Sequence, residues 1–75
     1  MKNCIRELRQ VQKMTQEQLS ELVDVSRQSI VAIETGKYNP SLKLAFRIAK
    51  QFGKTIEEVF YFEEGDDKNE WSVSR

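Results

Sequence analysis

The feature that most limits the fold of this 75-residue chain is the short stretch between two helical patterns. Apolar residues recur at helical spacing up to Val23, and a new helical pattern begins after Ser26. Only Asp24 and Val25 remain to end one helix and begin the next. Because the connection is so short, the two helices must cross sharply, with the first bracing the second.

The rest of the chain also has the periodicity of helices joined by short connections. Apolar residues recur three or four positions apart, which places them on one face of each helix. We therefore expect a mainly α fold with five helices. The repeating positions are Ile5, Leu8 and Val11; Leu19, Leu22 and Val23; Ile30 and Ile33; Leu42, Ala45, Ile48, Ala49 and Phe52; and Ile56, Val59 and Phe60.

Polar residues and glycines stand where these helices should begin and end. Two pairs match the capping box, in which a hydroxyl and a side chain three residues later satisfy each other's backbone amides. Two serines can cap further helices, and two glycines fall where a left-handed residue would end a helix. These residues are Thr15 with Gln18, Thr55 with Glu58, Ser26, Ser41, Gly36 and Gly53.

The end of the chain has a weaker pattern. The residues FYF at 60–62 precede the turn-rich EEGDDKNE, and residues 71–73 alternate apolar and polar. This pattern fits either a short C-terminal β-hairpin or an extended tail. We expect residues 1–60 to form the domain and residues 61–75 an acidic tail.

Several classes of function are disfavoured by what the chain contains. It has one cysteine, Cys4, and no histidine, so neither an internal disulfide nor the usual zinc and iron ligand sets can form. No nucleophile has a base beside it, and no loop resembles a phosphate cradle. No apolar run approaches the ~20 residues that span a bilayer. We expect a soluble cytoplasmic protein that is not an enzyme and needs no cofactor or small-molecule ligand.

The charges are balanced overall but unevenly distributed. Residues 1–54 hold 10 Lys or Arg and 5 Asp or Glu, a net charge of +5, whereas residues 55–75 hold 2 and 7, a net charge of −5. A nucleic-acid face followed by an acidic tail would give this pattern, and so would a solvated surface with an acidic end. Charge alone does not separate the two.

The helix after the short turn has side chains suited to reading DNA bases. With Ile30 and Ile33 facing the core, Arg27, Gln28 and Val31 face outward. An arginine fork matches guanine, a glutamine amide matches adenine, and a valine can contact a thymine methyl in the major groove. The candidates for contacts with the DNA phosphates on either side are Gln16, Lys37, Tyr38, Asn39 and Lys43.

The stretch TQEQLSELVDVSRQSIVAIETGKYNPSL resembles the helix-turn-helix core of the Cro and phage-repressor type of regulators, also called the XRE type. The resemblance extends over roughly residues 5–60, with the motif at 15–36, and implies a five-helix lambda-repressor-like DNA-binding domain. It implies a phosphate contact for Gln16 and base contacts for Arg27 and Gln28. It also implies that the loop at 37–39 lies along the DNA backbone. It also implies an ion pair between Arg9 and Glu34.

Two positions depart from the family pattern. The turn residue that is usually Gly is Asp24, which must adopt a left-handed conformation at modest cost. A small residue in the preceding helix is Ser20 rather than Ala. Neither change removes the motif.

The sequence also predicts self-association. Leu44, Phe46, Phe60, Tyr61 and Phe62 offer more apolar surface than a small domain easily encloses. We expect Leu44, Phe60, Tyr61 and Phe62 at a dimer interface, since short members of the resembled family are often homodimers. A twofold dimer would place two recognition helices ~34 Å apart on double-stranded DNA. We expect a repressor that binds an operator as a homodimer. The alternatives are an antitoxin of a toxin-antitoxin pair, or a protein-interaction module that no longer binds DNA.

Overall fold

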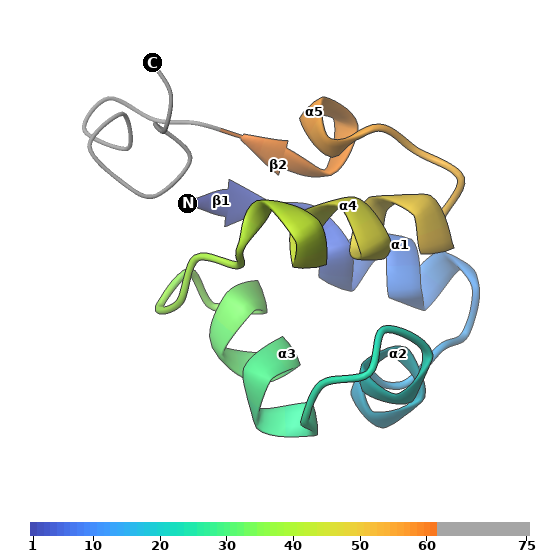
Figure 1. Ribbon diagram of the computed structural model, residues 1–75. Coiled ribbons are helices and arrows are strands. Elements are labelled where there is room, and N and C mark those ends of the chain that lie inside the picture. Colours follow the sequence, from blue (N-terminus) through green and yellow to red (C-terminus); the bar gives the residue numbers. More distant parts are fainter. Residues whose placement is uncertain (62–75) are drawn as a thin grey trace, which may run out of the picture.

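The computed structural model describes residues 1–61, so Phe62 and the strand considered at 71–73 lie outside the described residues. Five helices pack around one core, and two short strands lie at one end of them (Figure 1). The expected mainly α, five-helix fold is confirmed. In chain order the elements are β1 (Lys2–Asn3), α1 (Ile5–Val11), α2 (Gln16–Leu22), α3 (Arg27–Glu34), α4 (Leu42–Gln51), α5 (Ile56–Val59) and β2 (Phe60–Tyr61).

The core is built from the apolar face of every helix. Ile5, Leu19, Ile30 and Ile48 are fully buried, although they are far apart in sequence. The apolar spacing is a weaker guide at helix ends. Val11 and Leu22 are 81% and 53% exposed. Val11 is the last residue of α1, and Leu22 points away from the core because Leu19 and Val23 take the buried face of α2.

The helix caps form as the sequence predicts. The Thr15 hydroxyl accepts from the Gln18 N–H at 2.9 Å, and the Gln18 side chain accepts from the Thr15 N–H at 2.8 Å. Ser26 and Ser41 cap α3 and α4 through their hydroxyls. At α5 the Thr55 N–H donates to Glu58 Oε1 at 2.8 Å. This hydrogen bond holds the pKa of the Glu58 carboxyl below its usual value.

The two strands join the ends of the described chain in an arrangement that the helical pattern does not predict. Lys2 pairs with Tyr61 and Asn3 with Phe60 in an antiparallel register. The second strand of the expected C-terminal hairpin lies outside the described residues, and the described part of its first strand pairs with residues 2–3. The Cys4 N–H extends this contact by donating to the Val59 carbonyl at 3.0 Å.

The pairing of β2 also corrects one expected interface residue. Phe60 was expected on a self-association face, but its side chain is 2% exposed and belongs to the core of the single chain. Neighbouring strand residues point to opposite sides, so the next residue, Tyr61, is 44% exposed. Leu44 is half-buried against the same core.

The connection between α2 and α3 has the geometry that its length requires. Asp24 adopts the left-handed conformation with φ 63°, as expected from its place in the motif. The Val25 N–H then donates to the Ser20 carbonyl at 3.0 Å, which ends α2 and redirects the chain. Ser20 itself is buried, so α2 packs closely there. Lys13 also has a left-handed backbone, with φ 56°, which the sequence does not signal.

We expect Asp24→Gly to stabilise the domain by about 0.5 to 1 kcal/mol, because glycine adopts this conformation without the steric cost of a Cβ. Urea unfolding followed by circular dichroism measures the change. The matched control is Gln12→Gly, at φ −92°, where glycine should lower the stability. A loss of stability in both variants would contradict the assigned strain.

Candidate nucleic-acid interface

Helix α3 presents its first turn to solvent. The Ser26 hydroxyl accepts from the Ser29 N–H at 3.1 Å, which fixes where the helix begins. Ile30 and Ile33 are 0% and 1% exposed, and they set the rotation of the helix about its axis. Arg27 and Gln28 are therefore exposed at its start. Val31, expected one turn further on the same side, is half-buried.

The charge on α3 suits a polyanion. The sequence RQSIVAIE contains one carboxylate, Glu34, and its Oε2 lies 2.6 Å from Arg9 Nε. The exposed side of α3 therefore carries the positive charge of Arg27 with no unpaired carboxylate on the same helix. A negative partner meets no repulsion from α3.

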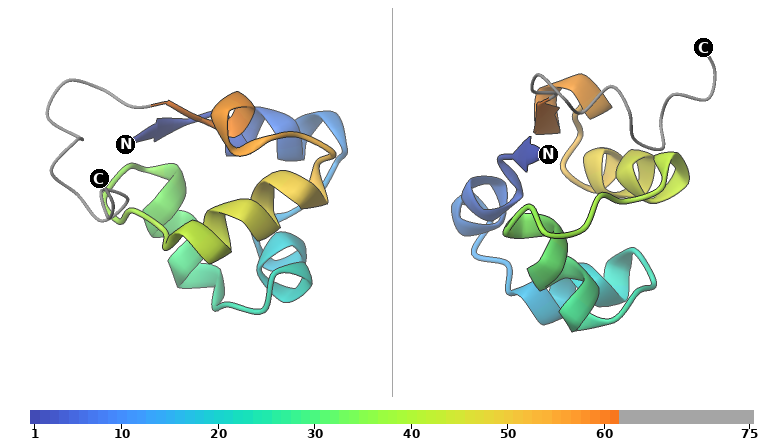
Figure 2. Two further views of the ribbon diagram at one scale, coloured as in Figure 1. Left: turned by 45° about the horizontal axis from the view of Figure 1, so that its top comes forward. Right: turned by 90° about the vertical axis from the view of Figure 1, so that its left-hand side faces the viewer.

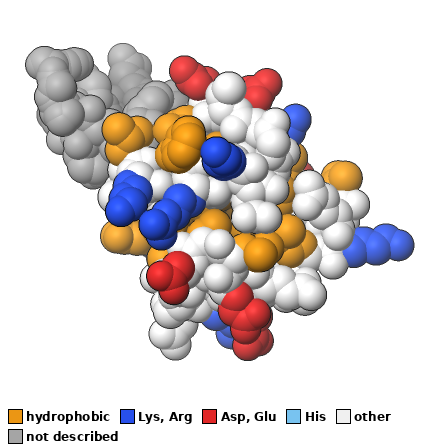
Figure 3. Space-filling model, turned by 45° about the vertical axis from the view of Figure 1, so that its right-hand side comes forward, with side chains coloured by type: hydrophobic (Ala, Val, Ile, Leu, Met, Phe, Trp, Pro, Cys, Tyr) orange, Lys and Arg blue, Asp and Glu red, His pale blue; other side chains and the backbone are white. Residues whose placement is uncertain are grey.

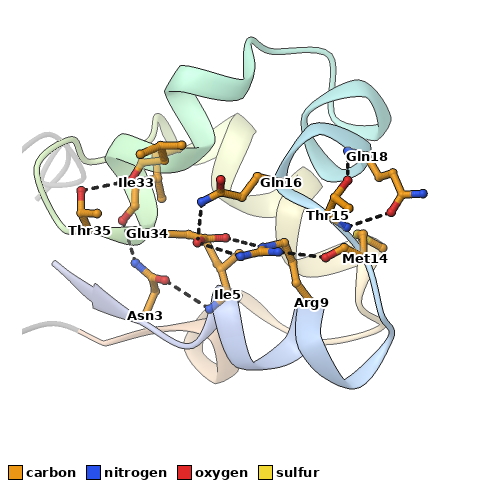
Figure 4. Close-up of polar contacts among 11 residues, drawn as sticks. Asn3, Ile5, Arg9, Met14, Thr15, Gln16, Gln18, Ile33, Glu34 and Thr35 are labelled. Carbon is orange, nitrogen blue, oxygen red and sulfur yellow. Dashed lines mark hydrogen bonds and ion pairs between the residues drawn. The ribbon is translucent and has the colours of Figure 1, made fainter.

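The Arg9–Glu34 ion pair joins three helices (Figure 4). Arg9 also donates through Nη2 to Glu34 Oε1 at 3.1 Å and through Nη1 to the Met14 carbonyl at 2.8 Å. Gln16 Nε2 donates to the same Glu34 oxygen at 3.2 Å. The side chains of Arg9 and Glu34 are only 12% and 6% exposed, so this network is a buried tie between α1, α2 and α3. The ion pair implied by the family pattern is confirmed.

Gln16 makes a hydrogen bond within the protein that the sequence does not predict. We expected this side chain at a phosphate, and the structure places it half-buried on Glu34. The bond uses one of the two N–H groups of the amide, so a phosphate contact through the other is compatible with it. A phosphate role for Gln16 stays a prediction.

The loop after α3 is fastened to that helix. The N–H groups of Lys37 and Tyr38 both donate to the Ala32 carbonyl, at 2.9 and 3.2 Å. Gly36 is left-handed with φ 81°, which allows the chain to turn back. Lys37 and Tyr38 are exposed, and Asn39 is half-buried. The expected phosphate-binding loop therefore keeps a fixed position beside the expected reading helix.

Lys43 completes the expected phosphate set from a different helix. It lies in the first turn of α4, directly after the loop, and is exposed. The Ser41 hydroxyl accepts from the Leu44 N–H at 3.1 Å, so the start of α4 is fixed as well. Three consecutive parts of the chain, α3, its following loop and the start of α4, thus carry the candidate cations.

Two other features of this region were missed from the sequence. Asn3 Nδ2 donates to the Ile33 carbonyl at 2.9 Å, and Asn3 Oδ1 accepts from the Ile5 N–H at 3.2 Å. Asn3 therefore fastens the end of α3 to the start of α1. An asparagine just before an apolar helical pattern is the available signal, since this residue type favours helix starts.

A groove beside the buried ion pair is the second missed feature. It has a volume of about 680 Å³ and runs between α1, the start of α2 and the end of α3. Arg6 and Lys13 line it together with Thr15 and Thr35. Its cations come from α1 and from the turn after it, where helical periodicity gives no hint of a shared surface.

Two acidic side chains lie far from α3. Glu57 and Glu58 belong to α5, at the opposite end of the molecule from α3 (Figures 1 and 2). Glu17 and Glu21 on α2 and Asp24 in the turn are exposed closer to α3. Residues 1–61 contain no helix that could cross a membrane and no group of three or more potential metal ligands.

An exposed helix braced across a sharp turn, with a cationic loop behind it, defines a helix-turn-helix domain. A helix-turn-helix family model matches residues 5–59. The chain belongs to the XRE-type helix-turn-helix family of DNA-binding transcriptional regulators.

Relatives of similar length support this assignment. An uncharacterized HTH-type transcriptional regulator of Methanocaldococcus jannaschii is 53% identical over 88% of this chain and 100% of its own. The uncharacterized HTH-type transcriptional regulator YgzD of Bacillus subtilis is 50% identical over 85% of this chain and 97% of its own. The clp gene regulator ClgR of Corynebacterium glutamicum has a similar fold, with a TM-score of 0.67 at 22% identity. That match covers 72% of this chain and 57% of ClgR.

Breaking the ion pair from one side should cost more than removing it entirely. Glu34→Leu leaves a buried guanidinium without its carboxylate, and we expect a loss of about 3 to 5 kcal/mol in the free energy of unfolding. The double variant Arg9→Leu with Glu34→Leu should lose less, since no charge is left unpaired. Urea unfolding of both variants and of the two single variants gives the comparison. A double variant less stable than both single variants would show that the pair does not act as a unit.

Proposed function

We propose that the protein is a repressor that binds its operator as a homodimer and reads base edges with the start of α3. The observation that supports this proposal is the exposure of Arg27 and Gln28 on a helix whose one carboxylate is already paired. Arginine and glutamine are the side chains that make bidentate contacts with guanine and adenine in the major groove. A repressor needs no further activity, since occupying the operator is sufficient.

The phosphate contacts are proposed for groups whose backbone is held in place. Lys37, Tyr38 and Asn39 belong to the loop that is tied to the Ala32 carbonyl, and Lys43 follows at the start of α4. Such contacts set the register of the helix on the duplex without reading sequence. Gln16, held by Glu34, would add a contact from the start of α2.

Dimerisation is proposed on the side of β2. Tyr61 is 44% exposed and lies opposite Lys2 in the strand pair. The neighbouring Cys4 thiol raises the pKa of its hydroxyl. Leu44 contributes the exposed part of a half-buried side chain. A single module reads few base pairs, and a twofold dimer doubles the site.

The division between reading and holding DNA can be tested with two substitutions. Arg27→Ala should relax the sequence preference at one position of each half-site and cost about 1 to 3 kcal/mol on the preferred operator. Lys37→Ala should weaken binding to all duplexes alike and reduce the salt slope by about one.

The measurement begins with the selection of bound sequences from a random duplex pool. The preferred and a scrambled duplex are then titrated with each variant over a range of salt. Arg6→Ala, an exposed cation on α1, serves as the control for general charge. Equal losses on both duplexes for Arg27→Ala would refute the base contact.

The dimer surface can be tested without DNA. Tyr61→Glu places a charge at the proposed interface, and we expect the dimer to dissociate in sedimentation velocity at tens of micromolar, because a buried unpaired charge is costly. Val11→Glu changes another exposed apolar residue and should leave the dimer intact. A wild-type monomer at these concentrations would rule the proposal out.

A further inference from the structure

The outer side of α4 is an amphipathic surface of which the proposed function uses only Lys43. Leu42 and Phe46 are 57% and 54% exposed and lie one turn apart. Lys43, Arg47 and Lys50 flank them and are exposed as well. Helix α4 contains no acidic residue. We call these five residues the α4 face.

The α4 face borders a groove against the end of α2. The groove has a volume of about 590 Å³, and its lining includes Leu22, Asp24, Phe46, Arg47 and Lys50. Lys50 Nζ lies 5.7 Å from the centre of the Phe46 ring. The space-filling view shows apolar and basic side chains side by side over this part of the molecule (Figure 3). The surface therefore combines an aromatic site with positive charge.

Two occupants fit this surface poorly. DNA phosphates would meet the cations, but Leu22, Leu42 and Phe46 offer them no hydrogen bonds. The α4 face of a second copy would bring its own cations against Lys43, Arg47 and Lys50, which like-charge repulsion opposes. The suitable ligand is an acidic segment that also carries an aromatic side chain.

The chain contains such a segment outside the described residues. Residues 63–70 have five acidic residues and one lysine, a net charge of −4, and Trp71 follows directly. We propose that residues 63–71 dock on the α4 face of the same chain, with the carboxylates on its cations and Trp71 in the groove beside Phe46. Acidic and aromatic groups then meet basic and aromatic groups.

The length and origin of this segment allow docking within one chain. Ten residues separate Tyr61 from Trp71, and an extended chain of that length spans up to ~33 to 36 Å. The principal extents of the molecule are 35, 21 and 18 Å. β2 ends on the side of the molecule where α4 begins (Figures 1 and 2). Residue 71 can therefore reach any part of α4.

Docking would have a consequence for the proposed DNA contacts, and this consequence alone depends on the proposed function. The segment would neutralise Lys43, which we assign to a phosphate, and would add negative charge beside the loop at 37–39. Binding to random duplexes, which depends on phosphate contacts alone, would weaken most. Specific sites would compete better because base contacts remain. The acidic segment would thus sharpen the preference for the operator.

The test uses the full-length chain and the fluorescence of Trp71, which is its single tryptophan. In low salt we expect emission at shorter wavelength and less quenching by acrylamide than in a synthetic peptide of residues 62–75. Raising the salt from about 0.01 M to about 1 M shortens the Debye length from ~30 Å to ~3 Å and should move both quantities toward the peptide values.

Substitutions on α4 identify the site. Arg47→Glu with Lys50→Glu should expose Trp71 to the quencher, and Phe46→Ser should do the same. Arg6→Glu with Lys13→Glu makes the same charge change on another surface and should leave the emission unchanged. Adding Asp66→Lys and Asp67→Lys to the Arg47→Glu, Lys50→Glu variant should restore the protection. Far-UV circular dichroism checks that each variant is folded.

The other outcomes overturn the proposal in distinct ways. Emission equal to that of the peptide, or insensitive to all α4 variants, would show that Trp71 does not bind there. Protection that disappears on dilution would assign the segment to a second copy. Protection abolished equally by the control pair would indicate general electrostatics rather than the α4 face. Each readout is independent of DNA, so failure of the repressor assignment would leave this test standing.

The DNA consequence is measured separately. Neutralising the segment by Glu63→Gln, Glu64→Gln, Asp66→Asn and Asp67→Asn should tighten binding to a random duplex at low salt. The same neutralisation in the Arg47→Glu, Lys50→Glu background should have a smaller effect, because docking is already lost. An equal effect in both backgrounds would mean that the segment repels DNA only through its net charge.

Discussion

The ion pair between Arg9 and Glu34 fixes the relative positions of the first three helices. Arg9 contributes three hydrogen bonds from its guanidinium, two to Glu34 and one to the Met14 carbonyl, and Gln16 adds a fourth to Glu34. Desolvating such a pair is costly unless its hydrogen-bonding capacity is used, and here three of the five N–H donors of Arg9 and both oxygens of Glu34 are used. The ion pair also neutralises Glu34, the one carboxylate of α3, so that this carboxylate adds little negative potential at the exposed face of the helix. One interaction therefore braces α3, and Arg27 then carries the only unpaired charge of that helix.

Much of the fold follows from local rules that a single sequence can express. The caps at Thr15, Ser26 and Ser41 form because hydroxyl side chains satisfy the first free amides of a helix. The left-handed Asp24 was predictable from the family resemblance, because it stands at the turn position that is usually Gly. The pairing of β1 with β2 was not predictable, because two-residue strands carry no periodicity and their partners lie 57 and 59 positions apart. The burial of Phe60 follows from that pairing, and it escaped prediction for the same reason.

The candidate site likewise has features that follow from local sequence and features that depend on long-range packing. The exposure of Arg27 and Gln28 follows from the spacing of Ile30 and Ile33, which are buried on the same helix. Contacts between distant segments, such as Asn3 with the Ile33 carbonyl, depend on packing that no local pattern records. The groove lined by Arg6 and Lys13 is of the same kind. Sequence predicts which side chains a helix displays, whereas the surfaces formed between elements require coordinates.

The bond from the Cys4 N–H to the Val59 carbonyl has a consequence for synthesis of the chain on the ribosome. The two helices of the motif contact each other as soon as α3 has emerged, since they are adjacent in sequence. The contacts of residues 2–4 with residues 59–61 can form only after β2 has been synthesised. Non-local closure of this kind is entropically costly and slow compared with contacts between neighbours. We therefore expect the contacts within the helix-turn-helix motif to form before those that join the two ends of the described residues.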